Sequence, residues 1–275
     1  MRWTPGGRSG NLEDRRGMGG LGKGLGIGGT VVVLALSLLT GRNLFNDLGV
    51  QPGVATGAPM TPEDSAREEI QVQFVSFVLD DTDSTWSRIL RQANEQYQAP
   101  KLVLFRNSTD SGCGFAQSAM GPFYCPLDQK VYIDLGFYDE LKTRFGASGD
   151  FAQAYVLAHE VGHHVQHLAG TDAQVRQAQG SNPNQANELS VRMELQADCF
   201  AGVWANSTQK RDILSPGDVD EAMSAAAAVG DDRIQQQTGQ RVNVDAFTHG
   251  SAQQRMDWFN RGFQSGDVRS CNTFS

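Results

Sequence analysis

The chain has 275 residues, of which 39% are hydrophobic and 20% are charged, a composition typical of a protein that folds around a core. Its net charge of −8 is divided unevenly: residues 1–23 carry five basic and two acidic side chains, and the remainder carries 18 basic and 29 acidic ones. Nucleic-acid binding needs clustered Lys and Arg, so we expect no nucleic-acid partner. The length suits one globular domain preceded by a further segment.

The most apolar run of the chain lies close to its N-terminus. Eighteen consecutive residues without charge extend from Gly24 to Gly41, which is just enough to span a bilayer as a helix. A buried helix and a cleaved signal peptide are the alternatives, but no convincing small-x-small cleavage site follows Leu39. We therefore predict a single-pass transmembrane anchor over residues 24–41.

The charges on either side of this run predict its orientation. The basic residues of 1–23 precede the run and only Arg42 follows it shortly, so residues 1–23 are expected to form a cytoplasmic tail. The rest of the chain would then lie on the outer, periplasmic or extracellular, face of the cell membrane. Residues 42–65 are rich in Gly, Pro and Ala and show no periodicity, which predicts a flexible linker before one domain over 66–275.

The cysteines agree with an oxidising compartment. All four lie in the predicted outer domain: Cys113, Cys125, Cys199 and Cys271. An even number there favours two disulfides, and four cysteines allow three pairings. Cys113 and Cys125 flank a short segment with Gly and Pro that would close as a loop, and this choice would join Cys199 to Cys271. Free thiols in a cytosolic protein are the alternative.

The periodicity of hydrophobic residues predicts a mostly helical α+β domain with a small sheet. Helices are expected over residues 62–98, 150–169, 186–205 and 251–264. A further helix is expected to open at Ser215-Pro216-Gly217-Asp218, where Ser215 can cap its start. Short runs rich in β-branched and aromatic residues predict strands over 102–105 and 130–135. The helix over 186–205 is expected to bury a stripe that includes Leu189 and Met193.

The helix over 150–169 contains His159-Glu160-Val161-Gly162-His163, which matches the motif HExxH. Residues four apart on a helix lie on the same face, so both imidazoles can bind one ion. Glu160 points in a neighbouring direction, where it can reach a water molecule rather than the metal, as a general base must. We therefore predict a Zn2+ site with His159 and His163 as ligands and Glu160 as the catalytic base.

A catalytic zinc site has three protein ligands and leaves one position for water. The longer motif HExxHxxGxxH is not met, because Gln166 replaces its Gly and Ala169 replaces its third His. Glu194 and Asp198, four apart on the second predicted helix, offer another common solution, although an isolated pair of this kind would more often be a solvated helix face. We expect Glu194 to be the third ligand and Asp198 to accept a hydrogen bond from a ligand imidazole, that of His159.

Three histidines lie outside the ligand set. We expect His164 and His167 to be structural or surface residues. A hydrolase of this kind needs a donor for the oxyanion of its tetrahedral intermediate, and His249 is our candidate, with Arg255 and Tyr132 as rivals. The strand VYIDL, which contains Tyr132, is expected to line the cleft and to pair with an extended peptide.

Seven segments of the chain carry a family resemblance. They are EDRRG (13–17), GPFYCPLDQKVYIDLGF (121–137), HEVGHHVQ (159–166), ELQADCFAGVW (194–204), AAAAVGDDR (225–233), FTHGSAQQR (247–255) and SGDVRSCNTF (265–274). With them the chain resembles, over nearly its whole length, the bacterial putative neutral zinc metallopeptidases, a family of anchored HExxH proteins. The resemblance implies a zincin-like metallopeptidase domain, zinc bound by His159, His163 and Glu194, and catalysis by Glu160.

The motif and the resemblance together predict a zinc-dependent metallopeptidase that acts on peptides or proteins. Zinc would lower the pKa of the water molecule bound to it toward about 7. Glu160 would take the proton from this water and deliver it to the leaving amine. Two alternatives remain: a metal-binding envelope scaffold without hydrolytic activity, and a zinc hydrolase of a non-peptide amide. The residues favour hydrolysis, and only the resemblance favours peptides. The oligomeric state is not predicted.

Overall fold

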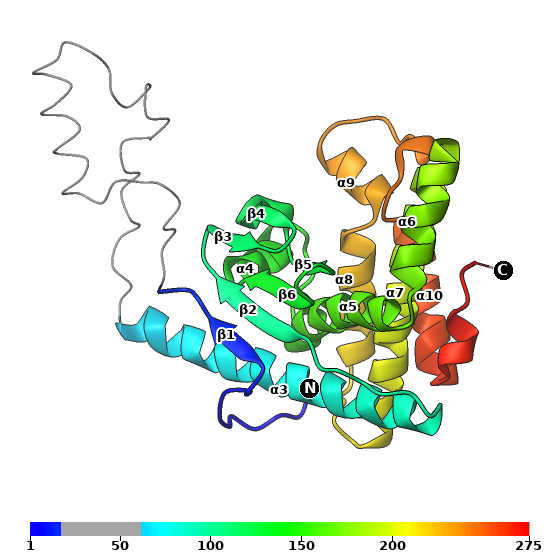
Figure 1. Cartoon of the computed structure of the whole chain (residues 1–275). Coiled ribbons are helices and arrows are strands. Elements are labelled where there is room, and N and C mark those ends of the chain that lie inside the picture. The colour runs from blue at the N-terminus through cyan, green and yellow to red at the C-terminus, as the bar shows by residue number, and fades with distance from the viewer. Residues whose placement is uncertain (18–61, 275) are drawn as a thin grey trace, which may run out of the picture.

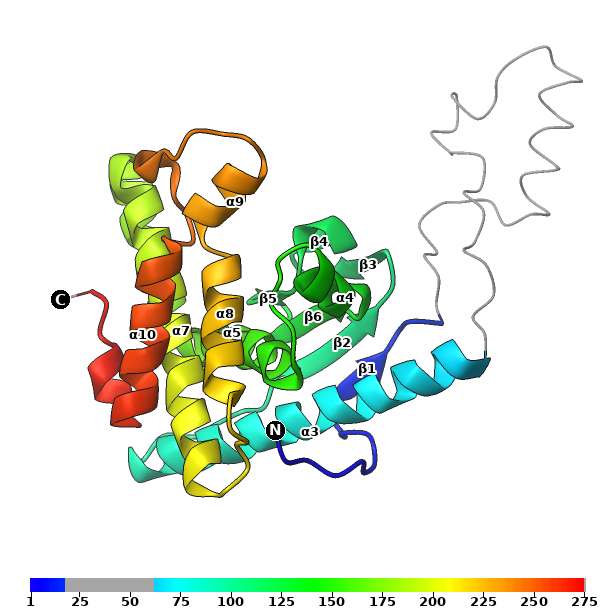
Figure 2. The same ribbon diagram turned by 180° about the vertical axis from the view of Figure 1, so that it is seen from behind.

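The computed structural model of the protein describes residues 1–17 and 62–274. In these ranges the chain is mostly helical with a small sheet, as the sequence predicts. The sheet lies beside a bundle of helices, and one long helix runs along the edge of both (Figure 1); the view from behind shows the same division (Figure 2). The predicted anchor over 24–41 lies outside the described residues. Among the helices that are described, none combines the length and hydropathy needed to cross a bilayer.

The main sheet has four short strands in the order β1-β2-β6-β5. Their bounds are Leu12–Asp14 for β1, Lys101–Phe105 for β2, Lys130–Asp134 for β6 and Phe123–Cys125 for β5. The first three strands are parallel, and β5 runs antiparallel to β6. A separate hairpin is formed by β3 (Ser108–Ser111) and β4 (Gly114–Gln117). The sequence predicted only β2 and β6 because these two carry the five-residue hydrophobic runs.

The helices cover one face of this sheet. Five of them are α3 (Pro62–Gln92), α5 (Asp150–Leu168), α7 (Ala186–Lys210), α8 (Asp218–Ala228) and α10 (Ala252–Ser265). The others are α4 (Gly136–Thr143), α6 (Thr171–Ser181) and α9 (Asp231–Gln237). Side chains from β2 and β6, including Leu104 and Ile133, join the main core with Trp86, Phe151 and Trp204 from the helices. The core therefore lies between the sheet and the helix bundle.

Two predicted helix features differ from the structure. Leu189 and Met193 are only half-buried, because the first turns of α7 extend past the core and pack on α6. Ser215 does not cap α8: its N–H donates to the carboxylate of Asp218, and Gly217 precedes the helix. Ser251 does cap α10, since its hydroxyl accepts from the backbone N–H of Gln254.

α7 and α10 pack at unusually close range. A Cβ atom on Gly262 of α10 would lie 2.0 Å from the carbonyl oxygen of Cys199 on α7. The same region is tied by the disulfide between Cys199 and Cys271, and a second disulfide joins Cys113 to Cys125 of β5. Both predicted pairings are confirmed. The close packing and the disulfide fix α7 relative to the end of the chain.

Residues 1–17, predicted as a tail separate from the domain, pack against it in the structure. β1 pairs with β2, and Trp3 contacts Phe74 of α3 with ring centroids 5.2 Å apart. The amino group of Met1 lies 2.6 Å from Asp150 Oδ1 at the start of α5. The folded unit therefore includes this N-terminal segment and resumes at Pro62, four residues before the predicted boundary.

The basic side chains of this segment explain the difference. Arg8 pairs with Glu69, and Arg16 pairs with Glu68 at 2.8 Å, both carboxylates belonging to α3. The positive charge from which a cytoplasmic tail was predicted is thus neutralised by the acidic start of a helix in the same domain. In this arrangement the segment and the domain lie together, whereas the predicted topology places a membrane between them.

Candidate metal centre

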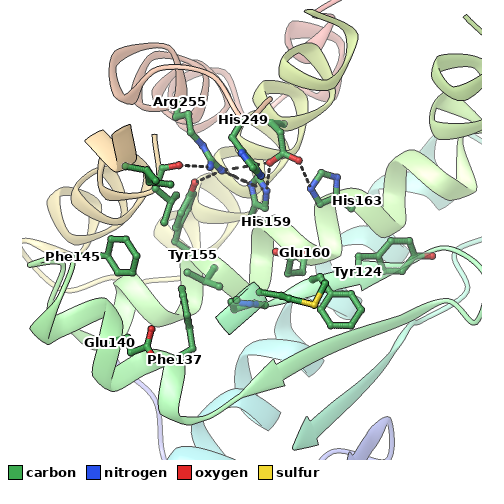
Figure 3. Close-up of a pocket in the computed structure, with 18 of the residues that line it drawn as sticks. Tyr124, Phe137, Glu140, Phe145, Tyr155, His159, Glu160, His163, His249 and Arg255 are labelled. Carbon is green, nitrogen blue, oxygen red and sulfur yellow. Dashed lines mark hydrogen bonds and ion pairs between the residues drawn. The ribbon is translucent and has the colours of Figure 1, made fainter. Parts of the chain in front are cut away.

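The HExxH motif lies in the middle of α5, which is buried along most of its length. The exposed fractions of His159 and Glu160 are 6% and 8%, and His163 is half-buried. Figure 3 shows His159, Glu160 and His163 on neighbouring turns of α5 beside one cavity. Most of α5 packs in the core, and His159, Glu160 and His163 are among its residues that line the cavity wall.

Glu194 comes from α7 and faces both imidazoles. Its Oε2 lies 3.1 Å from His159 Nε2, and its Oε1 lies 3.4 Å from His163 Nε2. The helices approach closely because Gly162 faces α7: a Cβ there would lie 3.0 Å from the carbonyl oxygen of Ala197. One ligand atom from each of the three residues lies within 4.8 Å of the others. Two imidazole nitrogens and one carboxylate oxygen at this separation fit the donor set of a catalytic zinc site.

His159 is held by a buried cluster around Asp198. Its Nδ1 lies 2.8 Å from Asp198 Oδ1, and Arg255 donates to both oxygens of the same carboxylate at 2.8 and 2.9 Å. Tyr155 adds a third donor through its hydroxyl. Burial opposes ionisation of Asp198, but Arg255 and His159 lower its pKa. Since a carboxylate only accepts, His159 Nδ1 carries a proton and Nε2 faces the metal position, as predicted for this pair.

The carboxylates make the space between the imidazoles favourable for a cation. Although burial lowers it, Asp198 and Glu194 raise the pKa of His159 to about 10. Glu194 raises the pKa of His163 in the same way, again against the effect of burial. The same electrostatic preference that holds a proton here would hold a divalent metal ion in its place.

His163 has an uncharged partner. Its Nδ1 lies 2.8 Å from Oε1 of Gln166, which is completely buried. The amide nitrogen of Gln166 donates to the carbonyl oxygen of Met193 at 2.7 Å and to Gln196 Oε1 at 3.1 Å. The sequence singled out Gln166 only as a mismatch to the longer motif. Gln166 lies three residues after the ligand His163, on the same helical face. This spacing was the signal in the sequence that could have predicted a hydrogen bond between the two side chains.

His249 lines the same cavity, as predicted, and has a carboxylate partner that the sequence did not identify (Figure 3). Its Nδ1 lies 3.1 Å from Asp231 Oδ1. The other oxygen of Asp231 accepts the backbone N–H groups of Thr248, His249 and Gly250. The hydrogen bond to Asp231 raises the pKa of His249, so the charged imidazolium is favoured. Nothing in the local sequence of Asp231 indicates this contact.

The two rivals of His249 are placed differently. Tyr132 is 1% exposed, donates to Asp128 at 2.6 Å and does not line the cavity, so that alternative is wrong. Arg255 does line the cavity, but its guanidinium group is engaged by Asp198. His249 remains the best-placed donor of the three.

The two other histidines of α5 have structural partners, as expected. His164 is fully buried, with Tyr124 at one ring nitrogen and a backbone carbonyl at the other. Burial lowers the pKa of His164 to about 4. His167 lies 2.9 Å from Asp172. Both rings are therefore used in packing α5 against its neighbours.

The cavity has a volume of about 630 Å³ and contains the three ligand residues, Glu160 and His249. The VYIDL strand predicted to pair with a peptide is β6, which lies between β2 and β5 and has no free edge, so that prediction is wrong. β5 ends the strand order, and its residues Phe123 and Tyr124 line the cavity. Phe137 and Phe145 line it as well, and Figure 3 shows them on the side away from Tyr124.

The family model described as Putative neutral zinc metallopeptidase matches residues 1–274. The chain belongs to this family. The chain is also similar to uncharacterized proteins of two different bacteria. Uncharacterized protein YpfJ of Escherichia coli (strain K12) is 50% identical over 287 residues, covering 100% of this chain and 99% of that protein. Uncharacterized protein Rv2575 of Mycobacterium tuberculosis (strain ATCC 25618 / H37Rv) is 49% identical over 205 residues, covering 70% of this chain and 67% of that protein. No solved structure gives a significant match.

Membership in this family implies Zn2+ as the metal. In the described part of the chain two groups of side chains offer converging ligand atoms. One consists of His159, His163 and Glu194, and the other is a carboxylate group around Asp150 that binds the amino group of Met1. The first group has the nitrogen donors that zinc prefers.

Proposed function

We propose that the protein is a zinc-dependent metallopeptidase in which His159, His163 and Glu194 hold the metal and Glu160 is the general base. The observation that carries this proposal is the convergence of the three ligand side chains in a cavity that also contains Glu160 and His249. Two helices that share a metal beside a sheet with a free edge make the arrangement zincin-like. A bound zinc ion supplies a Lewis acid for the substrate carbonyl and for water.

The surroundings of Glu160 suit proton transfer. The side chain is 8% exposed, and burial raises its pKa, although the neighbouring His159 and His163 oppose this shift. A carboxylate with a raised pKa holds a proton more firmly than an ordinary Glu in water. Glu160 can therefore take a proton from the attacking water and pass it to the leaving amine.

His249 is proposed as the donor for the oxyanion. Asp231 engages Nδ1 and favours the charged ring, so Nε2 is the remaining N–H for the substrate. Three backbone N–H groups hold Asp231, which keeps the imidazole in a fixed direction. A donor positioned before the reaction stabilises the developing charge without having to reorganise.

Peptides are the proposed substrates because of β5. An extended chain can add to a sheet edge through backbone hydrogen bonds, which are independent of side-chain identity. Phe123 and Tyr124 bring this edge to the cavity wall. A small amide substrate would gain nothing from such an edge.

We also propose that the domain acts outside the cytoplasm. The disulfides Cys113–Cys125 and Cys199–Cys271 support this location, because disulfides persist in oxidising compartments. Alkylation of intact cells followed by a non-reducing gel tests it. We expect all four cysteines to be protected until a reductant is added, and labelling without a reductant would contradict the proposal.

The proposed activity is tested on the full chain by measuring bound zinc and the cleavage of a peptide mixture by mass spectrometry. The variants are Glu160→Gln and, as a control, Glu188→Gln on the exposed start of α7. We expect one zinc per chain in all three proteins and cleavage reduced about 10²–10⁴-fold by Glu160→Gln alone.

Each other outcome decides against a part of the proposal. Equal cleavage by the wild type and Glu160→Gln would exclude Glu160 as the base. Stoichiometric zinc without any hydrolysis would favour an envelope scaffold protein. Hydrolysis of small amides without peptide cleavage would favour a non-peptide substrate.

A further inference from the structure

A chain of buried amides leads from the C-terminal segment to His163. It begins at the carbonyl oxygen of Cys271, to which Gln196 Nε2 donates at 3.0 Å. Gln196 Oε1 accepts from Gln166 Nε2 at 3.1 Å, and Gln166 Oε1 faces His163 Nδ1 at 2.8 Å. Gln166 and Cys271 are 0% and 1% exposed, and Gln196 is 9% exposed. Water therefore offers little competition to these hydrogen bonds.

Two backbone carbonyls fix the direction of this chain. A carbonyl can only accept, so the end of Gln196 that faces Cys271 must be its NH2 group, and its oxygen must face Gln166. The carbonyl of Met193, 2.7 Å from Gln166 Nε2, independently requires the NH2 group of Gln166 at the same end. The remaining atom, Gln166 Oε1, is then an acceptor. His163 Nδ1 must carry the proton, which leaves its Nε2 lone pair directed at the metal position.

From this polarity we infer that Gln166 is a positioning residue for metal binding, which holds His163 as the Nδ1–H tautomer and is itself held through Gln196 by the carbonyl of Cys271. The inference rests on the proposed metal site. An imidazole exchanges readily between two tautomers in water, and only one of them presents Nε2 as a ligand. A fixed acceptor at Nδ1 removes the unproductive form and also fixes the ring plane.

The C-terminal segment takes part because it is covalently attached to α7. Cys271 is bonded to Cys199, which lies one turn after Gln196 on the same helix. Thr273 adds a hydrogen bond to the carbonyl of Arg192 at 2.8 Å. The carbonyl of Cys271 is therefore held against the helix that carries both Gln196 and the ligand Glu194.

The test compares zinc affinity, measured by competition with a chelator, in the wild type and three variants of the full chain. Gln166→Met has nearly the same length but no acceptor, and Gln196→Met removes only the second link. Gln179→Met is the control, because Gln179 makes two hydrogen bonds of 3.0 Å to the start of α7 and contacts no ligand. We expect Gln166→Met to weaken zinc binding about 10–100-fold. Gln196→Met should cause a smaller loss, and Gln179→Met should cause none.

A second readout separates positioning from general loss of structure. In zinc-free protein with ¹⁵N-labelled histidine, at a pH where the imidazole of His163 is neutral, the ring nitrogen shifts show which nitrogen of His163 carries the proton. We expect Nδ1–H in the wild type and in Gln179→Met, and a changed or averaged pattern in Gln166→Met. If Gln166→Met does not fold, Gln196→Met decides, because its weaker zinc binding is expected in a folded protein.

Two results overturn the inference in distinguishable ways. Zinc affinity and ring shifts that are unchanged in Gln166→Met and Gln196→Met would exclude the positioning role while leaving the proposed peptidase intact. A wild-type protein that binds no zinc would overturn the metal site itself and this inference with it.

Discussion

His159 and His163 present the same ring nitrogen to one metal position, but their other nitrogens meet different chemistry. His159 faces Asp198, an ion buried together with Arg255, whereas His163 faces the uncharged amide of Gln166. The charged partner makes its imidazole a stronger ligand, and it also has to be neutralised inside the protein. The neutral partner orients its ring without adding charge.

The position of the other carboxylates accounts for this division. Glu194 already adds to the effect of burial in raising the pKa of Glu160. A further carboxylate beside His163 would raise that pKa again and would need another buried cation. An amide supplies the same acceptor without this repulsion. A charged partner therefore stands beside His159, where Arg255 can balance it. A neutral partner stands beside His163, where a further carboxylate would raise the pKa of the base Glu160.

The largest effect on stability is expected from Arg255→Met, which removes the guanidinium group from the buried cluster of Asp198 and His159. Asp198 would stay buried without the guanidinium group, the stronger of its two cationic partners, at a cost of about 3–5 kcal/mol. Urea titration of the zinc-free protein measures this loss. Arg261→Met, on the exposed face of the same helix, is the control and should cost less than about 1 kcal/mol. Equal losses in the two variants would show that the charged cluster does not depend on its cation.

Asp83 extends the comparison to a half-buried carboxylate without a cation. It accepts from Tyr97 and Asn11, no basic side chain of the described residues pairs with it, and burial raises its pKa to about 6. Because this folded-state pKa lies above the ordinary value of 3.8 for an Asp side chain, the stability of the wild type falls as the pH rises from about 4 to about 6. Asp83→Asn cannot ionise and should be more stable than the wild type by about 1–3 kcal/mol at pH 8.

Urea titration of the wild type and Asp83→Asn measures this difference at pH 8. The same titration at pH 3.5 supplies the control. Both side chains are neutral there, so the advantage of Asp83→Asn should largely disappear. Asp257→Asn, at an exposed position, should show no difference at either pH. An advantage of Asp83→Asn that is independent of pH would rule out ionisation as its cause.

Gly262→Ala tests whether the partners of His159 or those of His163 depend on the packing of α10. The new Cβ would lie 2.0 Å from the carbonyl oxygen of Cys199, so the helices must separate, at a cost of about 1–3 kcal/mol. α10 carries Arg255, whereas Gln166 and Gln196 join α5 to α7. We therefore expect double-mutant cycles to show coupling of Gly262→Ala with Arg255→Met and little with Gln166→Met. Gly180→Ala, which has open space around it, should leave stability within about 0.5 kcal/mol.

The smallest effect concerns His249, which lines the same cavity as the ligand residues and has Asp231 as its carboxylate partner. Asp231 raises the pKa of His249, so activity that needs the charged ring should fall as the pH rises through that pKa. Asp231→Asn lowers the pKa and should move this alkaline limb of kcat/KM to lower pH, by a few-fold change in rate at one fixed pH. His249→Gln is the reference and should remove the limb. An unmoved limb in Asp231→Asn would exclude the ion pair as its origin.

Much of the site followed from the sequence because it depends on local geometry. Helical spacing placed His159 and His163 on one face and Glu160 beside them, and the same spacing selected Glu194 with Asp198. The disulfide between Cys113 and Cys125 followed from a short loop, and the second pair followed from the first. The two long hydrophobic strands were also predicted, because five-residue runs carry a signal that three-residue strands such as β1 and β5 lack.

What only the tertiary structure decided are the contacts between polar residues far apart in the chain. Gln196 meets Cys271 across 75 residues, Arg255 meets Asp198 across 57, and Arg8 meets Glu69 across 61. A polar side chain has no periodic signature of its partner, since its hydrogen bond is made wherever the hydrophobic core brings an acceptor. The sequence therefore determined which residues can bind a metal. The packing of α5, α7, α10 and the N-terminal segment determined how those residues are held, because only packing sets the distances between groups that no local pattern connects.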